Sequence, residues 1–160
     1  MDACFINNGQ SCIAPSRLLV ERSVYEEVVD LVTAEVTSVK IGDPMVEGTH
    51  IGPVVNKRQF DSIQKLIKVG IDEGATLAVG GLGLPHGFNK GYYIRPTLFT
   101  DVENDMAIAQ NEVFGPVLSI IPFESEDQAV EIANDTPYGL AAYIQSTNHT
   151  RIERVSRRLR

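Results

Sequence analysis

The sequence predicts an α/β fold with a mainly parallel β-sheet and helices on both faces of that sheet. Short apolar segments alternate along the chain with longer segments in which apolar residues recur at helical spacing, and this alternation is typical of parallel sheets. Residues 117–123 form a near-continuous apolar run, as expected of a strand that is buried on both faces. The 160 residues are 43% hydrophobic and 22% charged, which is the composition of one globular domain.

The N-terminal part predicts one strand followed by one helix. Residues 17–21 are rich in large apolar side chains and therefore predict a strand. Ser23 with Glu26 three residues later has the pattern of a capping box, which predicts that Ser23 caps a helix reaching about Val39. Residues 41–44 include Gly, Asp and Pro, and this composition predicts a turn after the helix.

The middle of the chain predicts a second helix and two extended regions. Apolar residues at helical spacing predict a helix over residues 57–73, and Gly74 suits its C-terminal cap. Residues 76–79 predict a short strand, and the glycine-rich residues 80–91 predict a mobile surface loop. Residues 92–102 alternate well enough to predict one or two further extended segments.

The C-terminal part predicts a helix, a strand and a last helix. Ser125 and Gln128 form a second capping box, which predicts a helix over residues 125–134. Residues 141–145 predict a strand, and a cap within residues 147–148 predicts a helix that reaches the end of the chain. The last 13 residues carry five arginines and one glutamate. This basic end in an acidic chain suits contact within the protein or between subunits.

Charge and cysteine content exclude several classes of protein. The net charge of −7 argues against nucleic acid as a partner. The apolar runs are too short to span a bilayer, and the first residues lack the pattern of a secretory signal, so we expect no membrane partner. Two cysteines do not make a disulfide framework. They fit a reducing compartment, which predicts a cytoplasmic protein.

Both ends of the chain predict an incomplete domain. Residues 1–5 show neither an N-cap nor a polar lead-in, and the last residues lie within a predicted helix. A sheet that is cut in this way leaves an exposed edge or an apolar patch, and such surfaces favour association. The sequence therefore predicts a homo-oligomer.

The candidate for covalent chemistry is Cys12, which lies in the segment Asn7-Asn8-Gly9-Gln10-Ser11-Cys12-Ile13-Ala14. A glycine before the cysteine allows a tight turn, and the nearby amides can donate hydrogen bonds to a developing oxyanion. The thiolate of Cys12 would then be a strong nucleophile. The alternative is that Cys12 is a small buried hydrophobic residue, as we expect for Cys4. The spacing of the cysteines and histidines predicts no metal site.

A second candidate group comes directly before the apolar run at residues 117–123. Glu112 enters an apolar strand, where an unpaired carboxylate would be costly to bury. Glu112 is therefore either solvated at the edge of the strand or an acceptor of hydrogen bonds from a sugar diol, with Phe114 packed on a flat ring. The residues alone leave both interpretations open.

Taken together, these segments resemble the NAD(P)-dependent aldehyde dehydrogenase superfamily. Residues 5–17 are similar to its active-site cysteine signature, and Glu112-Val113-Phe114-Gly115-Pro116 is similar to its cofactor-binding E-x-F-G-P motif. Further similarities follow in the same order as in the family, and they extend over nearly all 160 residues. They are Gly42-Asp43-Pro44, Gly52-Pro53, Gly91-Tyr92-Tyr93, Arg95-Pro96-Thr97 and Asn134-Asp135-Thr136-Pro137-Tyr138-Gly139-Leu140-Ala141.

The resemblance implies a fold like the family's catalytic domain and a role for each candidate. Cys12 would attack the carbonyl of an aldehyde substrate to give a thiohemiacetal, and its backbone N–H would form half of the oxyanion hole. Hydride would pass to NAD or NADP, and water would hydrolyse the resulting thioester to a carboxylic acid. Glu112 would hold the hydroxyls of the nicotinamide ribose, and Phe114 would pack near the nicotinamide.

The resemblance also implies that several parts of the family's enzymes lie outside this chain. Residues 1–160 match an incomplete catalytic domain, without the Rossmann cofactor domain, the general-base glutamate of the E-L-G-G-K motif or the second oxyanion donor. We therefore do not expect tight cofactor binding by this chain alone. Two alternatives remain: a folded fragment or interaction module without activity, and a cysteine hydrolase, for which the sequence offers no positioned base.

Overall fold

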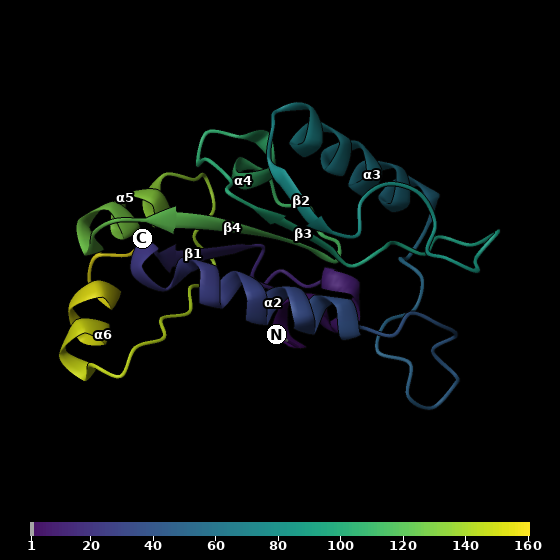
Figure 1. Ribbon diagram of the computed structural model, residues 1–160, viewed down its shortest axis with the longest axis horizontal. Helices are drawn as coiled ribbons and strands as arrows, with labels where there is room; N and C mark the ends of the chain where they lie inside the picture. Colours follow the sequence, from purple (N-terminus) through teal and green to yellow (C-terminus); the bar gives the residue numbers. More distant parts are fainter. Residues whose placement is uncertain (1) are drawn as a thin grey trace.

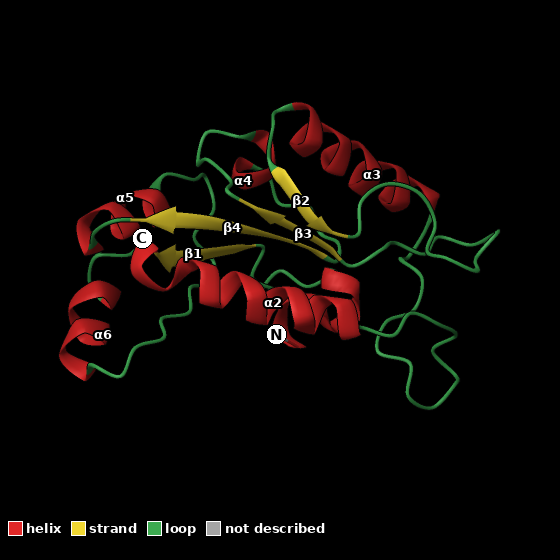
Figure 2. Cartoon of the chain, viewed as in Figure 1, coloured by secondary structure: helices red, strands yellow, loops and turns green. Residues whose placement is uncertain are grey.

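The computed structural model describes residues 2–160 and contains one four-stranded sheet with the strand order β1-β4-β3-β2. The central strand β4 pairs in parallel with both β1 and β3, and β2 lies antiparallel to β3 at one edge. The predicted mainly parallel sheet is therefore confirmed (Figures 1 and 2). The strands are β1 (Arg17–Glu21), β2 (Thr76–Val79), β3 (Thr97–Thr100) and β4 (Val117–Phe123).

Helices cover both faces of this sheet, as the sequence predicts. Helix α2 lies along one face, and helix α3 lies along the other (Figure 1). The α-helices are α1 (Asp2–Phe5), α2 (Tyr25–Ser38), α3 (Lys57–Asp72), α4 (Ala107–Gln110), α5 (Glu126–Asn134) and α6 (His149–Ser156). Two short 3₁₀ helices, η1 (Ile6–Gly9) and η2 (Arg22–Val24), precede β1 and α2.

The core consists of two apolar layers that share the central strand. Successive side chains of a strand point to opposite faces. Leu118 and Ile120 of β4 accordingly pack in one layer with Val36 of α2. Val117 and Ile121 pack in the other layer. The first five residues of β4 are buried, so the prediction of a strand covered on both faces is confirmed there.

The cap predictions succeed for α5 and fail for α2. The Ser125 hydroxyl accepts a hydrogen bond from the Gln128 N–H at 3.3 Å, as expected of the first residue of a capping box. Before α2, the chain forms the 3₁₀ turn η2, so the helix begins only at Tyr25. The Ser23 hydroxyl instead donates to the carboxylate of Glu21 at 3.3 Å.

Two further predictions at the C-terminal end are wrong. Residues 141–145 form no strand, because a strand needs a neighbouring backbone to satisfy its polar groups and this segment has none among residues 2–160. Helix α6 ends at Ser156 rather than at the last residue. The chain after α6 folds back on Asn134, whose side chain donates to the Arg158 carbonyl and accepts from the Arg160 N–H.

In the part of the chain that the structure describes, no helix is long and apolar enough to cross a membrane.

Candidate active site

The loop that carries Cys12 begins with three consecutive residues in the left-handed backbone region. The φ angles are 53° at Asn7, 58° at Asn8 and 67° at Gly9. Asparagine and glycine are the residues that adopt this conformation at least cost, because a short polar side chain or no side chain relieves the clash with the backbone. This turn ends η1 and directs the following residues, 10–16, towards the start of β1.

The amide side chains of this loop hold the loop itself together. Asn7 donates to the Gln10 carbonyl at 3.0 Å, and Asn8 donates to the Pro53 carbonyl at 3.2 Å. Gln10 donates to the Asn7 carbonyl at 3.3 Å and accepts from the Val55 N–H at 3.0 Å. Each side-chain NH₂ therefore uses one of its two donors on a backbone carbonyl, and the role of these amides towards an oxyanion stays a prediction.

Cys12 itself lies in a tight turn on the surface. The Ala14 N–H donates to the Ser11 carbonyl at 3.0 Å, which closes a turn with Cys12 and Ile13 at its centre. The Cys12 side chain is exposed, so its alternative role as a buried hydrophobic residue is wrong. Within residues 2–160, the Cys12 N–H makes no hydrogen bond. The turn therefore leaves the thiol exposed and this backbone donor without a partner among the described residues.

The second motif lies directly against the cysteine loop, although about 100 residues separate them in the sequence. A Cβ atom built on Gly9 would lie 2.1 Å from the Gly115 carbonyl oxygen, so only glycine allows this approach. A Cβ atom on Gly115 would in turn lie 2.6 Å from Ile63 of α3. The two glycines therefore bring the two predicted motifs together and seat them on α3.

Phe114 has an unusual backbone conformation that a helix side chain holds in place. Its φ angle is 51°, which is a strained value for an aromatic residue. Gln59, in the first turn of α3, donates to the carbonyls of Val113 at 3.3 Å and Phe114 at 2.9 Å. Strained backbone of this kind is typical of functional sites. Gln59 was not among the candidates from the sequence, because nothing in its own segment marks it.

The two motifs line one small hollow in the surface. Its lining includes Ser11 and Ala14 on both sides of Cys12, together with Glu112 and Phe114, but not Cys12 itself. Glu112 is exposed, and Phe114 is 37% exposed. Among the described residues, the Glu112 carboxylate has neither an ion-pair nor a hydrogen-bond partner, so it is available to accept hydrogen bonds from a ligand.

The other cysteine, Cys4, has a structural role, as predicted. Cys4 is 4% exposed and packs in the core layer beside α2. Burial raises the pKa of the Cys4 thiol to about 12, because the apolar surroundings disfavour the thiolate. Its Sγ lies 3.9 Å from the Val117 carbonyl as a weak donor.

Neither a metal centre nor a cysteine–histidine pair is present in the part of the chain that the structure describes. No group of three or more His, Cys, Asp or Glu side chains among these residues could hold a metal ion. The ring of His50 accepts a hydrogen bond from the Lys40 N–H at 3.0 Å and so supports a loop far from Cys12 in the sequence.

Comparisons with known proteins agree with this fold and these motifs. The model of the aldehyde dehydrogenase family matches residues 1–160. A crystal structure of an aldehyde dehydrogenase from Bartonella henselae is 51% identical with a TM-score of 0.97, and the match covers 99% of this chain and 33% of that one. The chain therefore belongs to the aldehyde dehydrogenase family, and its fold is that of the matching part of these enzymes.

Two further solved structures contain bound cofactor. Aldehyde dehydrogenase C from Pseudomonas syringae, as a cysteine-to-alanine mutant in complex with NAD⁺ and octanal, is 44% identical with a TM-score of 0.96. An aldehyde dehydrogenase from Mycobacterium tuberculosis in complex with NAD⁺ is 42% identical with a TM-score of 0.95. Each match covers 99% of this chain and 33% of the other. The chain also spans about a third of the length of the curated relatives it matches, 32% in the first of them.

Proposed function

We propose that this chain is the nucleophile-bearing part of an NAD(P)-dependent aldehyde dehydrogenase, which oxidises an aldehyde to a carboxylic acid. The observation that carries the proposal is the contact between Gly9 and Gly115, because it places the Cys12 turn beside the loop of Glu112 and Phe114. Chemistry that needs a thiol and a dinucleotide at one place requires such a juxtaposition. Residues 1–160 are, in this proposal, one incomplete catalytic domain.

Cys12 is the catalytic residue of the proposal. Its thiolate forms a bond to the carbonyl carbon, and the electron pair of the C=O bond moves to oxygen to give a thiohemiacetal. The Cys12 N–H, which has no acceptor among the described residues, donates to that oxygen. Oxidation of the thiohemiacetal gives a thioester on Cys12, which water hydrolyses to release the acid and the free thiol.

Glu112 and Phe114 fit the nicotinamide end of a dinucleotide. The free and exposed carboxylate of Glu112 can accept hydrogen bonds from both hydroxyls of a ribose, and the exposed Phe114 ring offers an apolar face to a flat heterocycle. Bound NAD or NADP supplies the hydride acceptor. The NAD⁺ complexes of two similar structures support this cofactor class. These two residues alone are too few for tight binding by the isolated chain.

The decisive experiment uses a chimera, in which residues 1–160 replace the matching third of the Bartonella henselae enzyme. It measures NAD⁺- or NADP⁺-dependent oxidation of a panel of aldehydes. We expect the chimera to be active and Cys12→Ser to lower kcat by at least about 10³-fold, because no other group replaces the nucleophile. Cys4→Ser is the matched control and should retain activity. Undiminished oxidation by the Cys12→Ser chimera would contradict the assignment.

The isolated chain tests the alternative of an inactive fragment or interaction module. We expect no NAD-dependent turnover by residues 1–160 alone, since the family's cofactor domain and general base have no counterpart in the matched region. A cysteine hydrolase activity of the isolated chain is disfavoured, because no histidine among the described residues is hydrogen-bonded to Cys12. The free thiols of Cys4 and Cys12 suit a reducing, cytoplasmic compartment, which is part of the same proposal.

A further inference from the structure

One segment after α5 contacts both of the loops that form the site. The Tyr138 hydroxyl accepts a hydrogen bond from the Glu112 N–H at 3.2 Å. Five residues later, the Tyr143 hydroxyl donates to the Ile13 carbonyl at 3.0 Å. Residues 138–143 therefore bridge the loop of the nucleophile and the loop of the cofactor carboxylate from a third place in the sequence.

We propose that Tyr138 and Tyr143 are positioning residues for aldehyde oxidation, Tyr138 for the cofactor carboxylate of Glu112 and Tyr143 for the thiol of Cys12. This inference rests on the function proposed above. Neither hydroxyl is proposed to touch substrate or cofactor. Each acts through the backbone of the residue that it holds.

The bond from Tyr143 restrains the turn that carries the nucleophile. Cys12 and Ile13 are the two central residues of the turn closed between Ser11 and Ala14. A hydrogen bond to the Ile13 carbonyl fixes the orientation of the Ile13–Ala14 peptide unit, whose N–H closes the turn on Ser11. Because the turn is exposed and otherwise held by one backbone hydrogen bond, this added restraint limits the directions in which the Cys12 side chain can point.

The bond from Tyr138 restrains the other half of the site. Glu112 precedes the strained backbone of Phe114, whose carbonyl is held by Gln59 from α3. Tyr138 holds the same loop from the opposite end, at the Glu112 N–H. Two anchors on one short loop fix its course, and they therefore fix where the Glu112 carboxylate lies relative to the cysteine turn.

The bridging segment can hold these loops because its own start is firmly attached. Arg17, at the beginning of β1, donates to the Asn104 side chain at 2.7 Å, and Asn104 donates to the Asp135 carboxylate at 2.7 Å. Gln110 donates to the backbone carbonyls of both Asn104 and Asp135. This polar network ties the residues just before Tyr138 to β1 and to the segment before Glu112.

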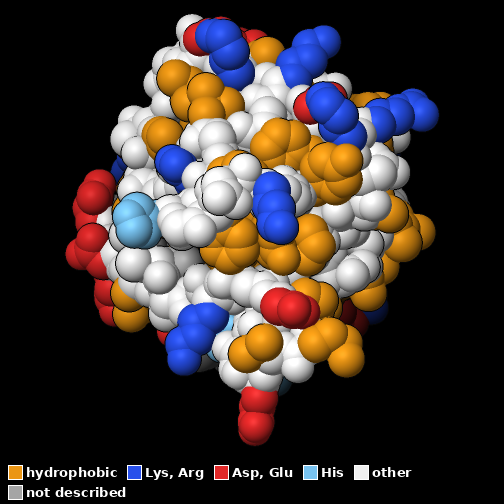
Figure 3. Space-filling view, turned by 90° about the vertical axis from the view of Figure 1, so that its right-hand side faces the viewer, with side chains coloured by type: hydrophobic (Ala, Val, Ile, Leu, Met, Phe, Trp, Pro, Cys, Tyr) orange, Lys and Arg blue, Asp and Glu red, His pale blue; other side chains and the backbone are white. Residues whose placement is uncertain are grey.

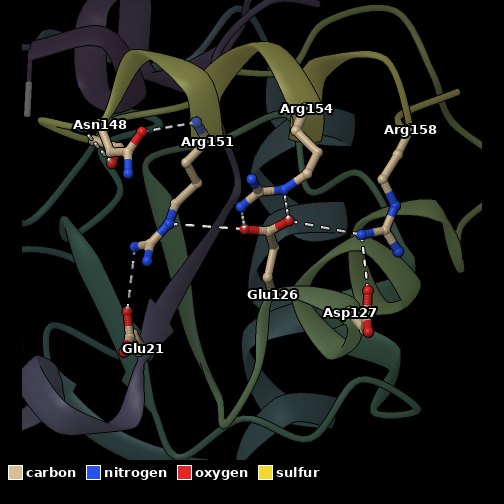
Figure 4. A network of polar contacts seen from close by, with 8 residues as sticks. Glu21, Glu126, Asp127, Asn148, Arg151, Arg154 and Arg158 are labelled. Atoms are coloured by element: carbon tan, nitrogen blue, oxygen red, sulfur yellow. Dashed lines mark hydrogen bonds and ion pairs between the residues drawn. The ribbon is translucent and has the colours of Figure 1, made fainter.

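Helix α6, which follows the bridging segment after residues 144–148, is attached to α5 by ion pairs. Glu126, at the start of α5, binds Arg154 through both carboxylate oxygens and also faces Arg151 and Arg158 (Figure 4). Figure 4 shows the three arginines of α6 and its C-terminal turn converging on this one carboxylate. The bridging segment thus lies between two attached parts of the chain, Asp135 before it and α6 after it. Its two tyrosines contact the site loops from this position.

The test uses Tyr138→Phe and Tyr143→Phe, each of which removes one hydroxyl and leaves the ring. In the active chimera, we expect Tyr138→Phe to raise the KM for the cofactor and Tyr143→Phe to lower kcat, each by about threefold to tenfold, as for one lost hydrogen bond. Each variant should leave the other parameter within about twofold. Tyr93→Phe is the matched control, because the Tyr93 ring packs on Phe88 at 4.4 Å and its hydroxyl bonds neither loop among the described residues. It should change neither parameter.

Amide hydrogen exchange in the 160-residue chain provides a readout that does not depend on activity. Tyr138→Phe should accelerate exchange at Glu112 and Tyr143→Phe at Ala14, by at least about threefold in each case. Exchange rates equal to those of Tyr93→Phe, or equal effects of both variants on kcat and KM, would overturn the inference. An inactive chimera with these exchange changes would instead refute the proposed function and leave the two bridges established.

Discussion

At the scale of single residues, the two cysteines show how position decides the fate of a thiol. Cys4 and Cys12 are eight residues apart, but the first is buried in a core layer and the second lies on an exposed turn. The thiolate is the reactive form of cysteine. Burial covers the Cys4 thiol and raises its pKa to about 12, whereas the Cys12 thiol is exposed to a reagent in solution.

Alkylation of the native chain tests this difference directly. With iodoacetamide at about pH 8, we expect one adduct per chain, located on Cys12 by peptide mass spectrometry. Cys12→Ser should abolish the adduct, and Cys4→Ser should leave it unchanged. Modification of Cys4 in the folded chain, at a rate similar to that of Cys12, would show that the core layer beside α2 is open to solvent.

The sequence predicts candidates for the reactive residues of the site but not the residues that hold them in place. Cys12, Glu112 and Phe114 lie in short motifs whose composition is informative by itself. Gln59, Tyr138 and Tyr143 act through one hydrogen bond or two to a backbone group far away in the chain. Such partners are determined by tertiary contacts, and a polar residue on an exposed helix or loop carries no local sign of them.

At the scale of elements, sequence patterns predict a helix or strand well where the local interactions are sufficient. Ser125 caps α5 as its capping box predicts, and the apolar spacing predicts α3 almost to the residue. The prediction for Ser23 fails because residues 22–24 form a 3₁₀ turn before α2, in which the Ser23 hydroxyl bonds the Glu21 carboxylate and caps no helix. Residues 141–145 have strand-like composition, but no neighbouring strand pairs with them among the described residues.

Helix α6 depends on charge for its attachment. None of its residues is buried, so apolar packing contributes little to its position. Glu126 is the common partner of three arginines, and Arg158 and Arg151 also reach Asp127 and Glu21 (Figure 4). The hydrogen bonds from Arg154 hold the pKa of Glu126 below its usual value of 4.5. This attachment is therefore complete above that pH and is lost as the pH falls through the lower, folded-state pKa.

Backbone relaxation by NMR tests this pH dependence. We expect the heteronuclear NOE of residues 149–156 to remain high at neutral pH and to fall as the pH drops below 4.5, while α3 stays rigid. Glu126→Gln should lower the NOE of α6 already at neutral pH. Glu131→Gln, which like Glu126→Gln lies on α5, is the control, because Glu131 makes no ion pair among the described residues. Equal mobility of α6 in both variants would contradict the role of Glu126.

At the scale of the whole molecule, the sheet and the loops leave surfaces that favour association. β1 is an edge strand with β4 as its one partner in the described chain. Hydrophobic side chains gather at the end of the molecule shown in Figure 3. The connection between α2 and α3, residues 39–56, reaches this end and carries the highly exposed Met45 and Val55. Open strand edges and apolar patches of this kind commonly mediate contacts between copies of a chain.

We therefore expect the isolated chain to self-associate, with a mass that rises above 17.5 kDa as concentration increases in light scattering. Met45→Lys combined with Val55→Lys should reduce this rise, because two charges oppose burial of the loop surface. Leu31→Lys, at an exposed position on α2, is the control and should leave the rise unchanged. A constant monomer mass over the whole concentration range would contradict the expectation.

The pairing of β1 with β4 also determines when the nucleophile acquires its surroundings during synthesis. The first residues of β1 pair with Ser119 and Ile120, so a ribosome must translate about 100 further residues before this strand has its parallel neighbour. The contact partner of Gly9, Gly115, emerges at nearly the same late moment. A nascent chain therefore carries an accessible thiol well before the geometry around Cys12 assembles, because about 100 residues separate Cys12 from Gly115.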